Sequence, residues 1–219
     1  MKRILILVEG PTEETIVRES LVPHLLSRGL SISSVIVTTS RLETGEKRKG
    51  GNSYEIVKRD LRTLLRDGNA VKVTTFFDFY GLPQDFPGMA DIPKGSCYER
   101  VAHVERALAS DINHPRFLPY LALHEFEAFI FTDPARCAWV FSDAPKEVIP
   151  TLEQHRASVN SPEELNEGRE TAPSKRILKA YPGYQKTVHG PLAVLEIGLP
   201  ALRAACPHFD QWLSTIEAL

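Results

Sequence analysis

Acidic side chains follow apolar, strand-like segments at three places in this sequence. The first acids come after the apolar run at residues 4–8, the second ends the run at residues 71–77, and the third group follows residues 117–123. Carboxylate oxygens are hard ligands of the kind that Mg²⁺ and Mn²⁺ prefer. The spacing therefore predicts a divalent-cation site whose metal ligands come from Glu9, Glu13, Asp78, Glu125 and Glu127.

A cation held by such acids bridges to phosphate oxygens and orients an attacking water, and two ions about 4 Å apart clamp both the entering and the leaving oxygen. The pattern thus predicts phosphoryl transfer, with Glu9 and Asp78 as catalytic residues. Glu9 is also a candidate general base or acid. A strand-end aspartate can instead merely cap a turn or a helix, so the pairing of Asp78 with Glu9 decides the interpretation.

Three further residues are candidates for the chemistry. His124 is a candidate proton relay, although a lone histidine beside a core strand is more often packed and hydrogen-bonded. Lys175 is a candidate catalytic cation and Arg176 a candidate substrate-binding residue. Both lie where a helix is expected to begin, and the helix dipole disfavours cations there, so an anionic neighbour would explain them. A solvated pair of cations is the competing interpretation.

Residues 41–51 form a basic, glycine-ended segment that contains Lys47, Arg48 and Lys49. One interpretation is a solvated loop, since runs of charge are usually exposed. The other is a phosphate-contacting loop with these three residues binding substrate, because glycine permits close backbone approach and the cations neutralise phosphates. The segment lacks the Gly-Lys-Ser/Thr order of a nucleotide-binding P-loop.

The elements that position these side chains alternate between strand-like and helix-like patterns. Residues 4–8 form an unbroken apolar run, which is typical of a strand buried on both faces of a parallel sheet. Helical spacing at residues 15–28, 54–66 and 97–109 separates this run from further predicted strands at 34–39, 71–77 and 117–123. Helices between strands imply parallel, right-handed connections. We therefore expect an α/β fold of Rossmann-like type, with a mainly parallel sheet flanked by helices.

After residue 132 the alternation of strand-like and helix-like patterns ends. Polar helical segments follow, a loop is expected at residues 183–189, and residues 192–202 are apolar enough to pack back on the sheet. Residues 84–96 are rich in proline and glycine and predict a long irregular loop beside the site. We expect residues 1–132 to form the α/β core and residues 133–219 a helical extension, together making one globular unit.

Composition limits the classes of function. Of the 219 residues 42% are hydrophobic, which suits one globular domain with a substantial core. A net charge of −2 gives no overall preference for nucleic acid, so such binding would need a local basic patch. The three cysteines lack metal-site spacing and predict a reducing compartment. The start Met1-Lys2-Arg3 lacks a signal-like apolar core, so we expect a cytoplasmic protein.

Four motifs in order resemble a known group of proteins: Glu-Gly-Pro-Thr-Glu from Glu9, Asp-Phe-Tyr-Gly-Leu-Pro from Asp78, His-Glu-Phe-Glu-Ala from His124, and Pro-Ser-Lys-Arg-Ile from Pro173. The first two look like the Toprim domain of topoisomerases, primases and the overcoming-lysogenization-defect nucleases. All four resemble an uncharacterised bacterial family of Toprim-like proteins often encoded beside an ATPase of the ABC or AAA type.

This resemblance implies a Toprim-like sheet, magnesium dependence, cleavage of nucleic acid such as DNA, and a role in defence against phage. Glu9 takes the place of the Toprim glutamate and Asp78 that of the first aspartate, whereas Tyr80 stands where Toprim has a second aspartate. We expect Glu125 or Glu127 to replace it. The alternatives are a phosphohydrolase or nucleotidyl transferase for small molecules, and a non-catalytic subunit that regulates an ATPase.

Overall fold

The computed structural model describes residues 1–38, 53–165, 168 and 170–219. In this part of the chain a five-stranded sheet has the order β2-β1-β3-β4, and the short β5 pairs with β3 beyond β4. Every pairing is parallel, which confirms the predicted α/β class. The strands are β1 Lys2–Val8, β2 Leu30–Ile36, β3 Ala70–Asp78, β4 Phe117–Leu118 and β5 Leu121–Ala122.

Strand β1 is buried on both faces because its side chains alternate between two hydrophobic cores. Ile4, Ile6 and Val8 belong to one core, and Leu5 and Leu7 belong to the other. An unbroken apolar run is what such a central strand requires. The first helical segment follows directly, as α1 Pro11–Ile16, the π-helical turn η1 Val17–Leu21 and α2 Val22–Leu26.

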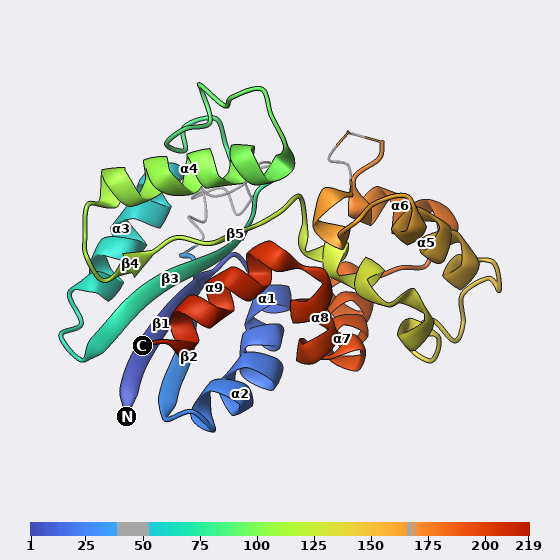
Figure 1. Ribbon diagram of the computed structural model, residues 1–219, viewed down its shortest axis with the longest axis horizontal. Coiled ribbons are helices and arrows are strands. Elements are labelled where there is room, and N and C mark those ends of the chain that lie inside the picture. Colours follow the sequence, from blue (N-terminus) through green and yellow to red (C-terminus); the bar gives the residue numbers. More distant parts are fainter. Residues whose placement is uncertain (39–52, 166–167, 169) are drawn as a thin grey trace, which may run out of the picture.

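Helices cover both faces of the sheet (Figure 1). The helices α3 Tyr54–Leu65 and α4 Cys97–Ile112 lie on the face that Leu5 and Leu7 enter, while α1, α2 and the C-terminal helix α9 Pro207–Glu217 lie on the other. The remaining elements form the C-terminal part: η2 Phe126–Thr132, η3 Pro134–Cys137, α5 Val148–Ala157, η4 Pro162–Glu164, α6 Pro173–Ala180, α7 Lys186–Ile197 and α8 Leu199–Ala205.

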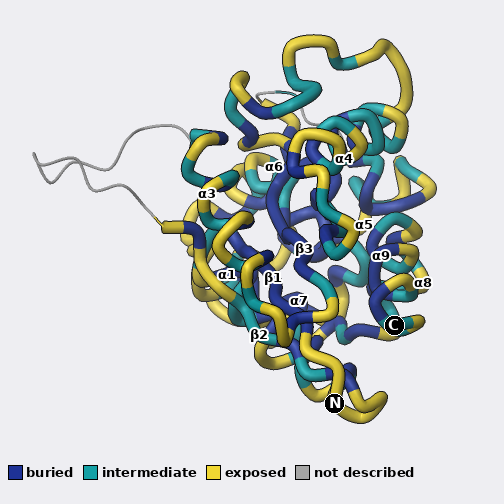
Figure 2. The backbone as a smooth tube through the Cα atoms, turned by 90° about the vertical axis from the view of Figure 1, so that its left-hand side faces the viewer, coloured by how far each residue is buried: buried dark blue, intermediate teal, exposed yellow. Residues whose placement is uncertain are grey.

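The last helix completes the core. Trp212 of α9 stacks on Tyr120 with 4.4 Å between ring centroids, and its indole Nε1 donates a 2.9 Å hydrogen bond to Oγ1 of Thr74 in β3. The buried strands β1 and β3 thus lie at the centre of the molecule, wrapped by chain from both ends of the sequence (Figure 2).

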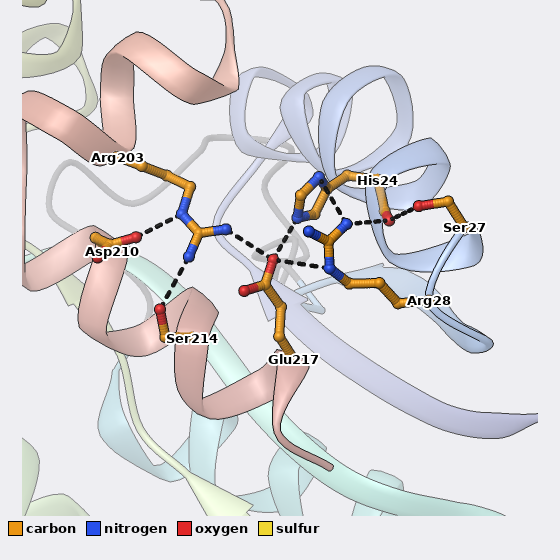
Figure 3. Close-up of polar contacts among 7 residues, drawn as sticks. All are labelled: His24, Ser27, Arg28, Arg203, Asp210, Ser214 and Glu217. Carbon is orange, nitrogen blue, oxygen red and sulfur yellow. Dashed lines mark hydrogen bonds and ion pairs between the residues drawn. The ribbon is translucent and has the colours of Figure 1, made fainter.

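Charged side chains fix the end of α9 to α2 (Figure 3). Oε1 of Glu217 accepts a 2.7 Å hydrogen bond from Nη1 of Arg203 in α8 and lies 3.3 Å from Nε of Arg28. The same oxygen is hydrogen-bonded to Nε2 of His24 in α2. Both termini lie at the same end of the molecule (Figure 1).

The structure corrects three details of the sequence-based prediction. The second strand is β2 at Leu30–Ile36 and not residues 34–39, because Leu30 and Ile32 are its inward-facing residues. The predicted strand at 117–123 is broken into β4 and β5, with Pro119 between them. The loop expected at 183–189 is wrong from Lys186 onwards, where α7 begins.

The helix α7 contains Gly190 and Pro191, and both residues are buried. A Cβ at position 190 would lie 3.0 Å from the hydroxyl of Tyr184, so glycine lets the helix approach this ring. None of the helices in the described part of the chain has the length and apolar character needed to cross a membrane. The division at residue 132 stays a prediction.

Candidate active site

Glu9 and Asp78 meet at the carboxyl ends of the neighbouring strands β1 and β3. The backbone N–H of Asp78 donates a 3.2 Å hydrogen bond to Oε1 of Glu9. Asp78 also accepts a 2.8 Å bond at Oδ1 from the N–H of Phe126, so its carboxylate is held by the start of η2. The order of the sheet changes direction between β1 and β3, and ligands of open α/β sheets bind outside such a switch point.

Two more carboxylates approach from the elements that follow. Glu13 lies in the first turn of α1, is 5% exposed, and accepts a 3.1 Å hydrogen bond at Oε2 from the N–H of Gly10. Glu127 lies in η2 and is 0% exposed, and within the described residues neither of its oxygens accepts a well-formed hydrogen bond. A buried carboxylate in this state needs a positive charge nearby.

Lys186 supplies that charge. Its Nζ lies 3.1 Å from Oε2 of Glu127 and 3.3 Å from Oδ2 of Asp78, so it forms an ion pair with each. It is the first residue of α7, more than 100 positions away from Asp78 along the chain. The acidic cluster is defined here as Glu9, Glu13, Asp78 and Glu127, with Lys186 as its cation.

The pKa values of the acidic cluster are raised. Burial, with the charge of Asp78 as the next contribution, raises the pKa of Glu13 to about 7. Burial also raises the pKa of Glu127 to about 7, against the opposing effect of Lys186. Burial and the neighbouring Asp78 and Glu13 raise the pKa of Glu9 well above its usual value, and burial raises that of Asp78. Glu13 and Glu127 therefore take up protons near neutral pH.

The pKa of Lys186 is raised too. Burial opposes its charge, but the carboxylates of Asp78 and Glu127 outweigh that effect. Its side chain remains 43% exposed, so solvent screens part of this attraction. One ammonium therefore faces four carboxylates, so the acidic cluster can still bind protons or a cation.

Glu125 lies near the acidic cluster but has a different partner. Its Oε2 accepts a 2.9 Å hydrogen bond from the N–H of Ser174, in the first turn of α6. Its charge still contributes to the raised pKa of Asp78 and of Glu127. The predicted ligand is thus placed beside the other acids, and one of its oxygens holds the start of α6.

Lys175 and Arg176, which were also predicted site residues, lie in α6 outside the acidic cluster. Lys175 is exposed in the first turn of α6, next to the Ser174 that Glu125 holds. Arg176 points elsewhere, since its Nε donates to the carbonyl of Thr171 at 2.7 Å and its Nη1 lies 2.9 Å from Nδ1 of His155. The predicted substrate-binding residues Lys47, Arg48 and Lys49 lie outside the described residues.

His124 is buried and has a left-handed backbone with φ of 68°. Burial, reinforced by the charge of Arg100, lowers its pKa to about 4, so the ring is neutral at neutral pH. Its carbonyl accepts a 2.8 Å hydrogen bond from the N–H of Tyr80. Tyr80 itself is 41% exposed, so Glu127 rather than Tyr80 provides the further buried group beside Asp78.

The donor chemistry of the acidic cluster fits a hard divalent cation. All four side chains offer carboxylate oxygens, and Glu127 has oxygens that no hydrogen bond among the described residues uses. Within the described residues, however, no group of three or more acidic, histidine or cysteine side chains converges closely enough to ligate one ion. An ion at this edge would therefore require the carboxylates, or Lys186, to move.

Sequence reasoning missed Lys186 because residues 183–189 were interpreted as a loop. Had the helix been placed from residue 186, Lys186 would have been a cation at a helix N-terminus, where the dipole disfavours it. That signal, applied above only to Lys175 and Arg176, points to an acidic neighbour.

A family model for a domain of unknown function, DUF4276, matches residues 8–217. The chain belongs to this family. The DUF4276 match extends from the last residue of β1 to the end of α9, so it contains the whole acidic cluster. No protein with a curated description matches the chain.

Solved structures similar to this DUF4276 domain include two C-terminal regions of OLD proteins. The one from Xanthomonas campestris pv. campestris has 16% sequence identity and a TM-score of 0.44, and 98% of each chain is covered. The one from Burkholderia pseudomallei has 16% identity and a TM-score of 0.45, with 97% of this chain and 99% of that chain covered. Likeness at this level of identity concerns the fold alone.

Proposed function

We propose that this protein is a Mg²⁺- or Mn²⁺-dependent phosphoryl-transfer enzyme of Toprim type, and that it cuts nucleic acid. The observation that carries this proposal is the acidic cluster at the switch point between β1 and β3. Three of its members, Glu9, Glu13 and Asp78, belong to the motifs that resemble Toprim. Buried acids with strongly perturbed pKa values at such an edge are typical of a catalytic site.

A divalent ion held by Glu9, Asp78 and Glu127 would polarise a phosphate and orient the attacking water. The chain's own groups provide the rest. Lys186 offsets negative charge on the phosphate, because its ammonium already lies at the centre of the acidic cluster. Glu13, with a pKa of about 7, is suited to accept a proton from water near neutral pH.

The test measures both binding and cleavage. Calorimetry should detect Mg²⁺ binding, and the protein with Mg²⁺ or Mn²⁺ should nick plasmid DNA. Glu9→Gln and Asp78→Asn should each lower the nicking rate by about 100-fold. Loss of a residue that only hydrogen-bonds to a metal ligand lowers activity by about 10- to 100-fold, and loss of the ligand itself should lower it at least as much. Glu19→Gln, an exposed acid in η1 outside the acidic cluster, is the control and should leave the rate unchanged. Equal activity in all three variants contradicts the proposal.

DNA as the substrate, a role in phage defence and a cytoplasmic location are parts of the same proposal. They rest on the resemblance to Toprim-like proteins encoded beside an ATPase. A partner ATPase of the ABC or AAA type would supply nucleotide-driven control.

A second candidate function is a non-catalytic Toprim-like subunit of such an ATPase. The favouring observation is that Lys186 already pairs with Asp78 and Glu127, so the acidic cluster has an internal cation. The exposure of Tyr80 in place of a second aspartate points the same way. Stable co-purification with the ATPase, together with no heat of Mg²⁺ binding and no nicking, would support this candidate over the first.

A further inference from the structure

Lys186 contacts the oxygens that a divalent ion in the acidic cluster would use. Its Nζ lies 3.3 Å from Oδ2 of Asp78 and 3.1 Å from Oε2 of Glu127. These two acids come from different elements, β3 and η2, so the ammonium bridges them. A hard divalent ion binds carboxylate oxygens of the same kind. The ion and the ammonium would therefore compete for Asp78 and Glu127.

The carboxylates of the acidic cluster are held more firmly than Lys186. Asp78, Glu9 and Glu13 each accept a hydrogen bond from a backbone N–H group, at 2.8 Å, 3.2 Å and 3.1 Å. Glu127 is 0% exposed, so its carboxylate is enclosed by protein. Moving one of these acids to make room would break a backbone contact or disturb the core.

Lys186 can leave the acidic cluster more easily. Its side chain is 43% exposed, and an ammonium on a flexible four-carbon stem is strongly hydrated in water. Lys186 is also the first residue of α7, where the helix dipole disfavours a positive charge. Turning this side chain outward breaks two ion pairs, and the backbone of α7 can stay in place.

We propose that Lys186 is an internal competitor of the metal ion: it pairs with Asp78 and Glu127 in the metal-free protein and turns out of the acidic cluster when a divalent ion binds. The inference rests on the proposed function and adds its regulation, because the ion binds only at a concentration that outweighs the ammonium. The exchange replaces one positive charge by two, which suits four carboxylates better. The displaced ammonium stays attached to the start of α7, where a substrate phosphate can accept its hydrogen bonds.

The first measurement is calorimetry with MgCl₂ on wild type, Lys186→Met and Lys186→Gln. Both variants lack the ammonium, so each should bind Mg²⁺ about tenfold more tightly, a usual coupling between two ligands that exclude each other. Lys186→Arg keeps the positive charge and should bind no more tightly than wild type. Lys179→Met, an exposed lysine in the last turn of α6, is the matched control and should bind like wild type, because solvent screens its charge. Circular dichroism verifies the fold of each variant.

The second measurement follows Lys186 itself, because loss of a nearby cation strengthens metal binding whether or not that cation moves. It needs no variant. Acetic anhydride acetylates the lysines of wild type that it can reach, and peptide mass spectrometry gives the extent at each one. MgCl₂ should raise the acetylation of Lys186 several-fold over a sample in NaCl of equal ionic strength. Acetylation of the exposed Lys179 should stay the same in both salts.

The outcomes separate this inference from the proposed function. The inference alone is overturned if wild type binds Mg²⁺ while Lys186 stays protected from acetylation. It is also overturned if Lys186→Met and Lys186→Gln gain no affinity, or if Lys186→Arg gains as much as they do. Binding of Mg²⁺ to Lys186→Met and Lys186→Gln but not to wild type supports the inference and contradicts the nuclease proposal, because wild type then keeps its own cation. If none of these proteins binds Mg²⁺, both fail.

Discussion

At the scale of single residues, the acidic cluster is defined by an imbalance of charge. Four carboxylates lie around one ammonium, and three of them are less than 10% exposed: Glu13, Asp78 and Glu127. Protons or a divalent cation can make up the difference. The balance between these two possibilities sets how the protein responds to pH.

We expect Glu13 and Glu127 to lower the stability of the metal-free protein as the pH rises from about 4.5 to about 7, against an opposite contribution from buried His124, whose pKa is lowered to about 4. Glu13 and Glu127 have pKa values of about 7 when folded against 4.5 ordinarily. In this window they hold protons in the folded protein that the unfolded chain has released, so their contribution to the free energy of unfolding falls with pH and levels off above about 7. The raised pKa of Lys186 acts only at much higher pH.

Thermal unfolding at pH 5 and pH 8, with and without MgCl₂, measures this effect. Mg²⁺ should raise the melting temperature more at pH 8, where the carboxylates are ionised. Relative to wild type, Glu127→Gln should be more stable at pH 8 than at pH 5, and Glu14→Gln, on the same turn as Glu13 but outside the acidic cluster, should show no such difference. If stability changes between pH 5 and pH 8 by the same amount in wild type and in Glu127→Gln, the assignment is contradicted.

Replacing Lys186 by methionine should destabilise the protein. Removing one partner of a buried ion pair costs about 3–5 kcal/mol. Because the side chain of Lys186 is 43% exposed, we expect a smaller loss of about 1–2 kcal/mol at pH 8 and less at pH 5, where the acids are protonated. Urea unfolding measures the difference. Lys175→Met, an exposed lysine in the first turn of α6, is the control, and equal losses in both variants would show that Lys186 has no special role.

At the scale of elements, a buried glutamate holds the helix that closes the core. Glu163 of η4 is 1% exposed and accepts 3.0 Å hydrogen bonds from the backbone N–H groups of His208 and Phe209, in the first turn of α9. Helix N-termini leave such N–H groups without partners, and a negative charge there also complements the dipole. Glu163 therefore caps α9 from a distant part of the chain.

We expect Glu163→Ala to lower the free energy of unfolding by about 2 kcal/mol, because two N–H groups would lose a charged acceptor in a buried place. Glu163→Gln keeps one acceptor oxygen and should lose about half as much. Urea unfolding of the two variants, with unchanged Mg²⁺ affinity as a check on the site, tests this role. A loss below about 0.5 kcal/mol for the alanine variant would show that water replaces the cap.

At the scale of the whole molecule, the larger hydrophobic core is built from both parts of the chain. Ile4, Ile6 and Phe76 of the sheet share this core with Phe209 and Trp212 of α9. The helix α7 contributes to the same core and also delivers Lys186 to the acidic cluster. Folding and the assembly of the site thus depend on the same C-terminal elements.

A fragment of residues 1–132 should therefore fail to fold by itself. Without α9 its sheet would expose part of an apolar face, because Trp212 would no longer shield Phe76 and Tyr120, and without α7 the helix α1 would lose a packing partner. Far-ultraviolet circular dichroism during heating measures whether a cooperative transition remains. Adding residues 133–219 as a second chain should restore it, whereas a cooperative transition in the 1–132 fragment alone would contradict this prediction.

The sequence by itself determined the parallel α/β fold and pointed to all four members of the acidic cluster, with Glu125 as a fifth candidate ligand. Unbroken apolar runs and helical spacing are local patterns, so β1, α3 and β3 could be predicted closely. Glu9 and Asp78 could be paired because acids at the ends of parallel strands share one edge of a sheet. Both arguments need only neighbouring residues and the regular geometry of strands and helices.

Only the tertiary structure decided which cation faces these acids and which glutamate stands among them. Lys186 lies 108 residues from Asp78, at the start of a helix that overlaps the loop predicted at residues 183–189. Glu125 and Glu127 are two residues apart, and the turn of η2 sends Glu127 into the acidic cluster and leaves Glu125 to hold α6. Contacts between distant segments depend on how the helices pack, and local sequence patterns do not determine that packing.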